Sequence, residues 1–582
     1  MGSGPTGGPK DVTPPEYRKS TPLPNAVNYD KNKIEIEFNE YILLDNPTKN
    51  LVVSPTQDVA PIAKGIGRKV LIELKDSLLE NTTYTFDFGN SIVDNNERNP
   101  LVGYVFSFST GETIDTLMIS GSVINADNLS PVSDIYVGVY SDLEDSVFTS
   151  RKMERITKTN AKGQFTLRNL AEKPYNVYAL EDVNSNFYFD QKPEGIAVLG
   201  EAVTPWIEIK TKSDTIRTDS VTIDTIVTRN VVRYFPDSLL LRFYKENDNR
   251  QYFIKAERNE ASKFTLYFKN FTKNLPEITP INFEGDDWFV SEPSITKDTL
   301  VYWVKDSLIY KQDTICFAID YEKTDSLDNL IPARDTIYAF YKTKELTRKE
   351  KKEKAGKIDF TKLLSQPGVV EIYNKPVIEW EKPLQSFDKE FISLTVKKDT
   401  VWIDIDFQIE RDTLKNRRTY IIVANFESEK EYKMQIDSAA VTDIYDRHNN
   451  KIEAKFKIKN KDEYANLIVS LKNEPENAFL QLLDKTDMPF MQTPVVKGTG
   501  TFMHVKPGEY FLRMIVDRNG NGRWDTGDYK EKIEPEEVFY YDQKIKLRVN
   551  WDVEEDWDVT KIPLLRQRPE ELKPATKGGK RK

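Results

Sequence analysis

The alternating run Lys33-Ile34-Glu35-Ile36-Glu37-Phe38-Asn39 indicates the fold class of the chain. The apolar side chains of Ile34, Ile36 and Phe38 fall on one face of an extended strand, and the polar side chains fall on the other. Further strand-like runs follow at residues 70–74, 83–88 and 104–109, with a turn-rich segment at 94–100. Short strands separated by turn signals predict an antiparallel β-sandwich.

Composition and charge exclude several classes of function. The 582 residues suffice for roughly four or five domains. The net charge of -10 is spread along the chain, which argues against a nucleic-acid partner because such a partner requires a basic stripe. The single cysteine, Cys316, lies in an apolar run and is expected to be a buried small hydrophobe. The two histidines, His448 and His504, lie in different domains, so a histidine-based zinc site or catalytic triad is not expected.

A second informative stretch is Asp517-Arg518-Asn519-Gly520-Asn521-Gly522-Arg523-Trp524-Asp525-Thr526-Gly527-Asp528. Its oxygen-bearing residues have the spacing of a twelve-residue calcium loop, with Gly522 at the sharp turn. The predicted Ca²⁺ ligands are Asp517, Asn519, Asn521, Arg523 through its carbonyl, Asp525 and Asp528. A strand rather than a helix precedes the loop, so a signalling EF-hand is excluded. The alternative is a polar hairpin whose Asn and Gly residues only supply turn conformations.

A weaker copy of this loop lies upstream, with candidate metal ligands at Asp182, Asn184, Asn186 and Asp190. Here Phe187 replaces the turn glycine, and Pro193 takes position 12, leaving Glu194 as the nearest substitute; the turn interpretation is therefore favoured. A tyrosine, Tyr175 or Tyr510, stands seven residues before the first aspartate of each loop. This repetition predicts that the chain contains duplicated domains.

Residues 5–111 resemble a bacterial Ig-like domain of the S-layer type, through the segments 34–40, 78–85, 93–101 and 106–110. The leader Pro5-Thr6-Gly7-Gly8-Pro9-Lys10-Asp11 before that domain is similar to the start of Bacteroidota outer-membrane lipoproteins. Three segments, 117–123, 163–167 and 175–180, resemble a transthyretin-like, carboxypeptidase-regulatory-type sandwich. That family is mostly structural or adhesive. These resemblances imply an all-β chain of tandem antiparallel β-sandwiches, Ig-like and transthyretin-like, in an elongated multidomain arrangement.

The expected organisation has eight segments. They are a flexible tether (1–15), an Ig-like domain (16–111), a transthyretin-like sandwich (112–208), a second Ig-like domain with its connector (209–346), a charged linker (347–366), a third Ig-like domain (367–459), a second transthyretin-like sandwich with the calcium-type loop (460–551) and a C-terminal tail (552–582).

The sequence contains no phosphate loop, no Gly-x-Ser-x-Gly elbow and no zinc-protease motif, so no catalytic residue and no enzyme activity are expected. The resemblance implies a lipoprotein at the outer membrane, on the cell surface or on the periplasmic face, held to the membrane only by an N-terminal lipid anchor. We expect a structural or adaptor subunit that binds outer-membrane or cell-surface proteins, with an assembly, secretion or transport complex as one setting for it. Glycan binding is the alternative, with Trp551 and Trp557 as a candidate sugar platform.

Overall fold

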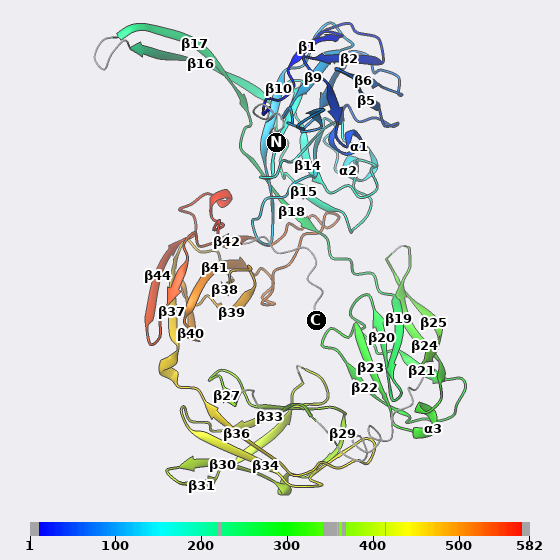
Figure 1. The fold of residues 1–582 in the computed structure, drawn as a ribbon, viewed down its shortest axis with the longest axis vertical. Helices are drawn as coiled ribbons and strands as arrows, with labels where there is room; N and C mark the ends of the chain where they lie inside the picture. Colours follow the sequence, from blue (N-terminus) through cyan, green and yellow to red (C-terminus); the bar gives the residue numbers. More distant parts are fainter. Residues whose placement is uncertain are drawn as a thin grey trace, which may run out of the picture.

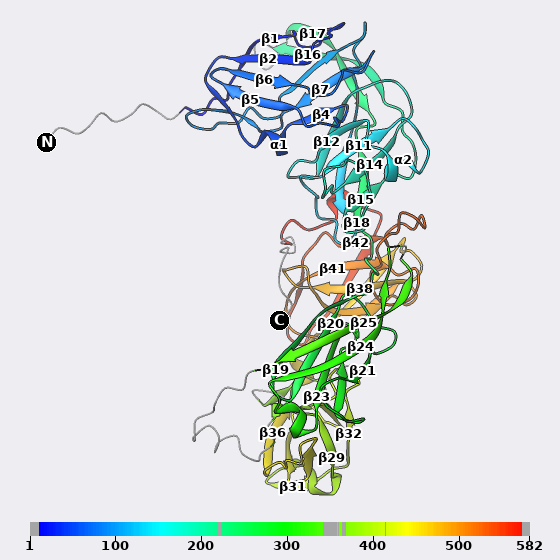
Figure 2. The same cartoon turned by 90° about the vertical axis from the view of Figure 1, so that its right-hand side faces the viewer.

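The computed structural model describes residues 11–217, 223–326, 328–341, 358, 360–363, 368–413 and 415–572. It is an elongated, almost entirely β molecule in which five sandwich modules follow one another along the chain (Figures 1 and 2). Within the described residues, no helix has the length and apolarity that crossing a membrane requires. The predicted all-β class is confirmed.

Module 1 is a sandwich of the sheets β1-β2-β6-β5 and β4-β7-β9, with β3 paired to β8. Its core contains Phe38, from the alternating run Lys33 to Asn39, together with Phe86 and Phe108. The elements are β1 (Tyr17–Thr21), β2 (Lys33–Phe38), β3 (Ile42–Leu44), α1 (Pro47–Asn50), β4 (Val52–Ser54), β5 (Ile62–Ile66), β6 (Lys69–Glu73), β7 (Thr83–Asp87), β8 (Ile92–Asp94) and β9 (Val105–Ser109).

Module 2 has the strand order β12-β11-β14-β15-β18-β10-β13. Its elements are β10 (Leu117–Asn125), β11 (Tyr136–Tyr140), α2 (Val147–Ser150), β12 (Arg155–Lys158), β13 (Gln164–Leu170), β14 (Asn176–Leu180), β15 (Gly195–Val198) and β18 (Leu239–Lys245). The predicted end of this module at residue 208 is wrong, because β18 lies beyond it in sequence and yet pairs in parallel with β10 of the same sheet. Between β15 and β18 the chain forms a long two-stranded arm, β16 (Trp206–Arg217) and β17 (Ile223–Phe235).

Module 3 packs the sheet β19-β20-β23-β22 against β21-β24-β25 around Phe264, Trp288 and Phe317. Cys316 is buried in this module. The elements are β19 (Phe253–Glu260), β20 (Lys263–Phe268), β21 (Glu277–Pro280), β22 (Phe289–Pro293), β23 (Thr299–Val304), α3 (Ser307–Tyr310), β24 (Thr314–Thr324) and β25 (Leu330–Phe340).

Module 4 packs β26-β28-β33-β32 against β27-β36-β34-β30-β31 around Trp380. Ile358 belongs to its core, so the module begins before the predicted start at 367; most of the predicted linker lies outside the described residues. The elements are β26 (Phe360–Leu363), β27 (Val369–Val370), β28 (Val377–Trp380), β29 (Leu384–Phe387), η1 (Lys389–Phe391), β30 (Ile392–Lys398), β31 (Val401–Asp404), β32 (Phe407–Arg411), β33 (Thr419–Ala424), β34 (Glu431–Ile436), β35 (Val441–Asp443) and β36 (Ile452–Ile458).

Module 5 has the sheets β40-β37-β44 and β39-β38-β41-β42, with β43 paired to β41. Its elements are η2 (Lys461–Glu463), β37 (Ala465–Lys472), β38 (Ala478–Leu483), β39 (Pro489–Pro494), β40 (Thr499–Val505), β41 (Gly508–Val516), β42 (Val538–Tyr540), β43 (Ile545–Leu547), β44 (Asp552–Asp558) and η3 (Leu564–Arg566). Residues 552–572 were predicted to be part of a C-terminal tail, and this prediction is wrong. They belong to the folded structure, because β44 pairs in parallel with β37 and Leu572 is buried.

The chain returns on itself, so module 5 lies beside module 2 (Figure 1). One apolar cluster combines Ile124 and Leu129 of module 2 with Phe511 and Tyr540 of module 5. Polar contacts also join neighbouring modules elsewhere: Ser54 with Ile156 (modules 1 and 2), Glu292 with Arg418 (modules 3 and 4), and Glu371 with Lys506 (modules 4 and 5). The modules are therefore connected by specific contacts as well as by the chain.

Candidate functional site

The acidic loop of module 5 follows β41 and is organised by its first aspartate. The Asp517 carboxylate accepts hydrogen bonds from the backbone N–H groups of Asn521 at 3.0 Å and Gly522 at 2.8 Å. The Nδ2 atoms of Asn519 and Asn521 each lie 2.6 Å from Oδ2 of Asp525. Four of the predicted ligand side chains therefore converge on one region of the loop.

The loop is closed by a residue that the sequence interpretation missed. Glu536 is 2% exposed, and its two carboxylate oxygens accept hydrogen bonds from the backbone N–H groups of Arg518 at 2.8 Å and Asp525 at 3.0 Å. The predicted position-12 ligand, Asp528, instead accepts a hydrogen bond from the N–H of Glu531 in a separate turn. Glu536 thus takes the closing position that the twelve-residue spacing had assigned to Asp528.

The upstream loop of module 2 repeats this arrangement. Asp182 accepts hydrogen bonds from the N–H groups of Ser185, Asn186 and Phe187. The side-chain amides of Asn184 and Asn186 donate to Asp190 at 3.1 Å and 2.8 Å. Glu194, fully buried, accepts from the N–H of Val183 at 3.1 Å and from that of Asp190 at 3.4 Å. Burial raises the pKa of Glu194.

The turn geometry of the two loops is also the same. Gly520 and Gly522 have φ values of 71° and 72°, and the matching Ser185 and Phe187 have 64° and 62°. Phe187 therefore adopts the left-handed conformation at the position where glycine is the unstrained choice. In both loops a Pro-Glu pair, Pro193-Glu194 or Pro535-Glu536, supplies the closing carboxylate. That dipeptide was the sequence signal that could have identified Glu536.

Carboxylate, amide and carbonyl oxygens are the ligands that Ca²⁺ prefers. Each loop brings together the side chains of two aspartates, two asparagines and one buried glutamate, and Asp528 of module 5 lies outside its set. Among the described residues, no group of three or more His, Cys, Asp and Glu side chains is arranged to hold a metal. In both loops the carboxylates are engaged by backbone N–H groups and side-chain amides. Calcium binding therefore stays a prediction, with Glu194 and Glu536 added to its candidate ligands.

The module 5 loop is longer than its counterpart, and the extra residues contact module 2. The Tyr529 ring packs against Phe148 and Phe189, with centroids 5.4 Å and 6.0 Å away, and its hydroxyl donates to the carbonyl of Asp145 at 2.8 Å. Thr526 donates to the carbonyl of Lys245 at 2.6 Å. The two acidic loops consequently meet at the junction between modules 2 and 5.

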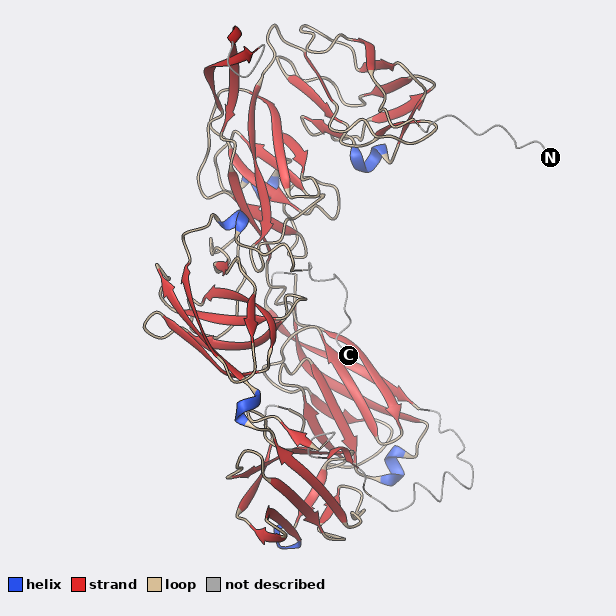
Figure 3. Ribbon diagram, turned by 60° about the vertical axis from the view of Figure 1, so that its left-hand side comes forward, coloured by secondary structure: helices blue, strands red, loops and turns tan. Residues whose placement is uncertain are grey.

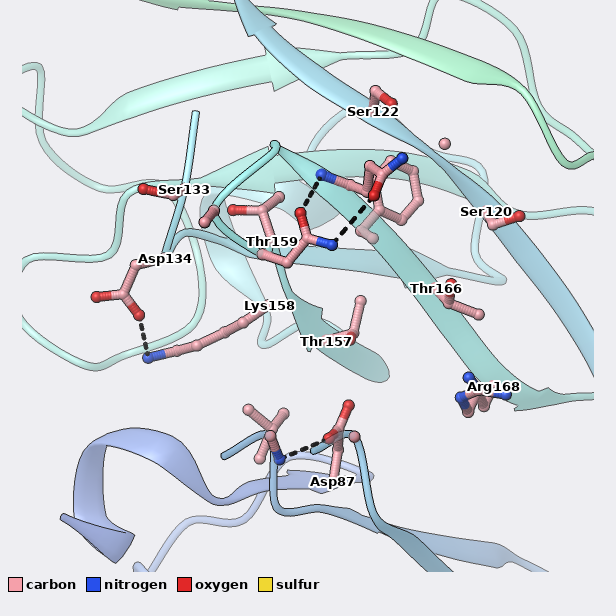
Figure 4. Close-up of a pocket in the computed structure, with 18 of the residues that line it drawn as sticks. Asp87, Ser120, Ser122, Ser133, Asp134, Thr157, Lys158, Thr159, Thr166 and Arg168 are labelled. Carbon is pink, nitrogen blue, oxygen red and sulfur yellow. Dashed lines mark hydrogen bonds and ion pairs between the residues drawn. The ribbon is translucent and has the colours of Figure 1, made fainter. Parts of the chain in front are cut away.

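A polar cavity of about 960 Å³ lies between modules 1 and 2. Figure 4 shows Ser120, Ser122 and Thr166 on one side and Asp87, the last residue of β7 in module 1, on the other. Burial raises the pKa of Asp87, whose carboxylate accepts a hydrogen bond from the N–H of Gly89 at 2.9 Å. Hydroxyl and amide side chains of this kind can bind the hydroxyl groups of a sugar.

The candidate sugar platform near the C-terminus is not formed. Trp557 is 5% exposed and belongs to the core of module 5, with its ring 5.7 Å from that of Tyr541. Trp551 is 53% exposed and lies under Arg548 instead. The two tryptophans therefore do not present a shared surface.

Comparison with known proteins finds one family whose model matches part of the chain. Residues 11–110 match the bacterial Ig-like domain family. No curated protein matches the chain.

Solved structures resemble the chain only distantly. The N-terminal part of the bacterial S-layer protein SbsC is 13% identical over 30% of this chain and 42% of its own length, with a TM-score of 0.13. A fragment of titin, I67–I69, is 10% identical over 53% of this chain and 100% of its own, with a TM-score of 0.12. A Bacteroides ovatus mixed-linkage glucan utilization protein, SGBP-B, is 10% identical over 84% and 99%, with a TM-score of 0.15. The family match covers residues 11–110, which form module 1.

Proposed function

We propose that this protein is a non-enzymatic extracytoplasmic lipoprotein that acts as a structural or adaptor subunit at the outer membrane. The observation that carries the proposal is the return of module 5 onto module 2. That contact holds the modules in a defined arrangement, so binding surfaces on different modules keep a set spacing. An adaptor within an outer-membrane assembly, secretion or transport complex requires such spacing between the proteins it binds.

Calcium is part of this proposal as a structural ion in the two acidic loops. A Kd of about 10⁻⁴ to 10⁻³ M, as in extracellular modules, would be sufficient outside the cytoplasm. The ion would stiffen the loops that meet at the junction of modules 2 and 5, and so would support the arrangement that the adaptor role requires.

The test is affinity purification of the tagged protein from solubilised outer membranes. We expect outer-membrane or cell-surface proteins in fixed stoichiometry with the protein. A matched control carries Tyr529→Ala, which weakens the contact between modules 2 and 5. Stoichiometric partners should be lost or reduced with that variant, and recovery of no stoichiometric partner by the unmodified protein would contradict the adaptor role.

The second candidate function is glycan binding, favoured by the polar cavity between modules 1 and 2. Affinity electrophoresis in gels loaded with polysaccharides tests it. We expect polysaccharide to retard the unmodified protein and the Trp551→Ala variant but not the Asp87→Ala variant. That result would assign sugar binding to this cavity. Equal mobility in gels with and without polysaccharide would exclude glycan binding for the polysaccharides used.

A further inference from the structure

Modules 2, 3, 4 and 5 form a closed ring, in which each module lies beside the next (Figures 1 and 3). At the junction of modules 2 and 3, Nζ of Lys192 lies 3.8 Å from the carboxylate of Asp328. The chain itself crosses the junctions from module 2 to 3, from 3 to 4 and from 4 to 5. Modules 2 and 5 are not neighbours in sequence, so non-covalent contacts alone close the ring at their junction. The ring therefore opens most freely there, because no peptide linker limits the separation of these two modules.

The last described residues of the chain, 562–572, lie across the junction of modules 2 and 5. Nη1 of Arg568 donates to the carbonyl of Asn128 in module 2 and, at 2.8 Å, to the buried carboxylate of Asp487 in module 5. Leu572 is buried in the apolar cluster that the two modules share. One short segment thus contacts both modules.

Side chains, rather than strand pairing, hold this segment in place. Oε1 of the buried Gln567 accepts a hydrogen bond from the N–H of Tyr540 at 3.2 Å. Among the described residues, the backbone–backbone hydrogen bonds of the segment all lie within it, as from the N–H of Arg566 to the carbonyl of Pro563. Such a terminal segment detaches at a lower free-energy cost than a strand, because no ladder of backbone hydrogen bonds is broken.

Two features make the seated position of the segment less favourable than a fully packed one. Nη2 of Arg568 is buried and has no hydrogen-bond partner in the described part of the chain, and an unpaired buried donor lowers stability. A cavity of about 260 Å³ remains beside the segment, lined by Leu129 of module 2, Phe539 of module 5 and Leu564, so packing there is incomplete. The seated and released states are therefore closer in free energy than complete packing would make them.

We propose that residues 562–572 are a latch that switches the ring between a closed and an open state. When the latch is seated, Arg568 and Leu572 hold module 5 on module 2. When it is released, module 5 keeps only the remaining contacts, such as those of Tyr529, and the ring opens. The regulatory meaning of the latch rests on the proposed adaptor function, because opening changes the spacing between binding surfaces. A protein that binds the released latch would shift the population toward the open ring.

The test compares the purified full chain with a variant that ends at Lys561. Removal of residues 562–582 should increase the radius of gyration measured by small-angle scattering. In a Cys316→Ala background, dyes on Leu143→Cys in module 2 and Met503→Cys in module 5, both exposed positions, should show a lower transfer efficiency. The matched control ends at Leu572, keeps the latch and should give the values of the full chain. Equal far-ultraviolet circular dichroism of the two shortened chains would show that the modules remain folded.

A synthetic peptide of residues 562–572 distinguishes a latch from an integral part of module 5. Added in excess to the variant that ends at Lys561, it should restore the radius of gyration and the transfer efficiency of the full chain. The same peptide with Arg568→Ala should need a concentration about tenfold higher, because it lacks the charged hydrogen bonds to both modules. The peptide with Arg566→Ala, an exposed residue of the same turn, should act like the unchanged peptide.

Two results overturn the proposal. One is a variant ending at Lys561 that stays as compact as the full chain, and the other is an opened variant that the unchanged peptide does not close. Neither result bears on the membrane pull-down of the unmodified protein, which tests the adaptor function. A pull-down without partners would likewise leave the measurements on the purified protein unaffected.

Discussion

The acidic loops of modules 2 and 5 share two left-handed turn positions and the hydrogen bonds to their first aspartate, but they differ in what surrounds them. In module 2 the closing glutamate, Glu194, comes four residues after Asp190, whereas in module 5 Glu536 comes eleven residues after Asp525. The additional residues include Tyr529, which packs on module 2. The same loop is therefore local in one copy and connects distant parts of the chain in the other.

The largest expected effect comes from the residues that only the longer loop contains. Tyr529→Ala removes an aromatic ring from the junction and should weaken the docking of module 5 on module 2 by about 3 kcal/mol, the lower end of the range for a core ring, because the Tyr529 side chain is only half-buried. Small-angle scattering should report an increased radius of gyration. Phe189→Ala, on the module 2 side of the same contact, is expected to act in the same direction; Trp551→Ala is the control for an exposed ring. An unchanged radius of gyration in both junction variants would contradict the contact.

The closing glutamates should give the next largest effect. Glu536→Gln replaces one acceptor oxygen by an amide donor facing a backbone N–H, which should reduce the free energy of unfolding by about 2 kcal/mol. Glu194→Gln is the matched change in module 2. Chemical denaturation of each variant measures the loss. Equal stability of wild type and both variants would show that the loops do not depend on these carboxylates.

The pH dependence of the Glu194 variant has a defined sign. Because burial raises the pKa of Glu194 in the folded protein, its contribution to stability is largest when the carboxyl is protonated, and this contribution falls as pH rises through the folded pKa. Glu194→Gln removes that titration. The difference between wild type and variant should therefore change with pH across the acid range, and parallel pH profiles would contradict it.

Calcium should have a smaller effect and should distinguish the loops. At ten times its Kd, Ca²⁺ would stabilise a loop by about 1.4 kcal/mol, so its addition should raise the melting temperature and a chelator should reverse the rise. Asp517→Ala should remove the response of module 5, and Asp182→Ala that of module 2. A melting temperature that does not respond to calcium would leave both loops as polar turns.

The smallest effect is expected at the left-handed turn position. Gly522→Ala should cost about 1 kcal/mol, because an L-residue at a φ of 72° is strained. At the equivalent position in module 2, Phe187→Gly removes that strain but also removes the ring packed 5.2 Å from Tyr136, so it should not stabilise the protein. Thermal unfolding of the two variants tests whether ring packing explains the tolerance of Phe187.

Local sequence determined the β class, the repeated loop pattern and four of the side chains in each acidic loop. Alternation as in Ile34–Phe38 specifies a strand wherever one face is buried, and the Asp-x-Asn-x-Asn spacing specifies a tight loop, because both depend on neighbours a few residues apart.

Only the tertiary structure decided the remaining features. The last strands of modules 2 and 5, β18 and β44, pair in parallel with β10 and β37 across connections of more than 70 residues, and no local period encodes such pairing. The twelve-residue spacing could not predict Glu536 as the closing residue, because the segment between Asp525 and Glu536 is extended and packs on module 2. The contact between modules 2 and 5 depends on Ile124, Phe511 and Tyr540, which in sequence resemble ordinary core residues. Long-range packing decides which surface an apolar side chain covers, so the sequence alone does not distinguish a side chain at a module junction from one inside a module.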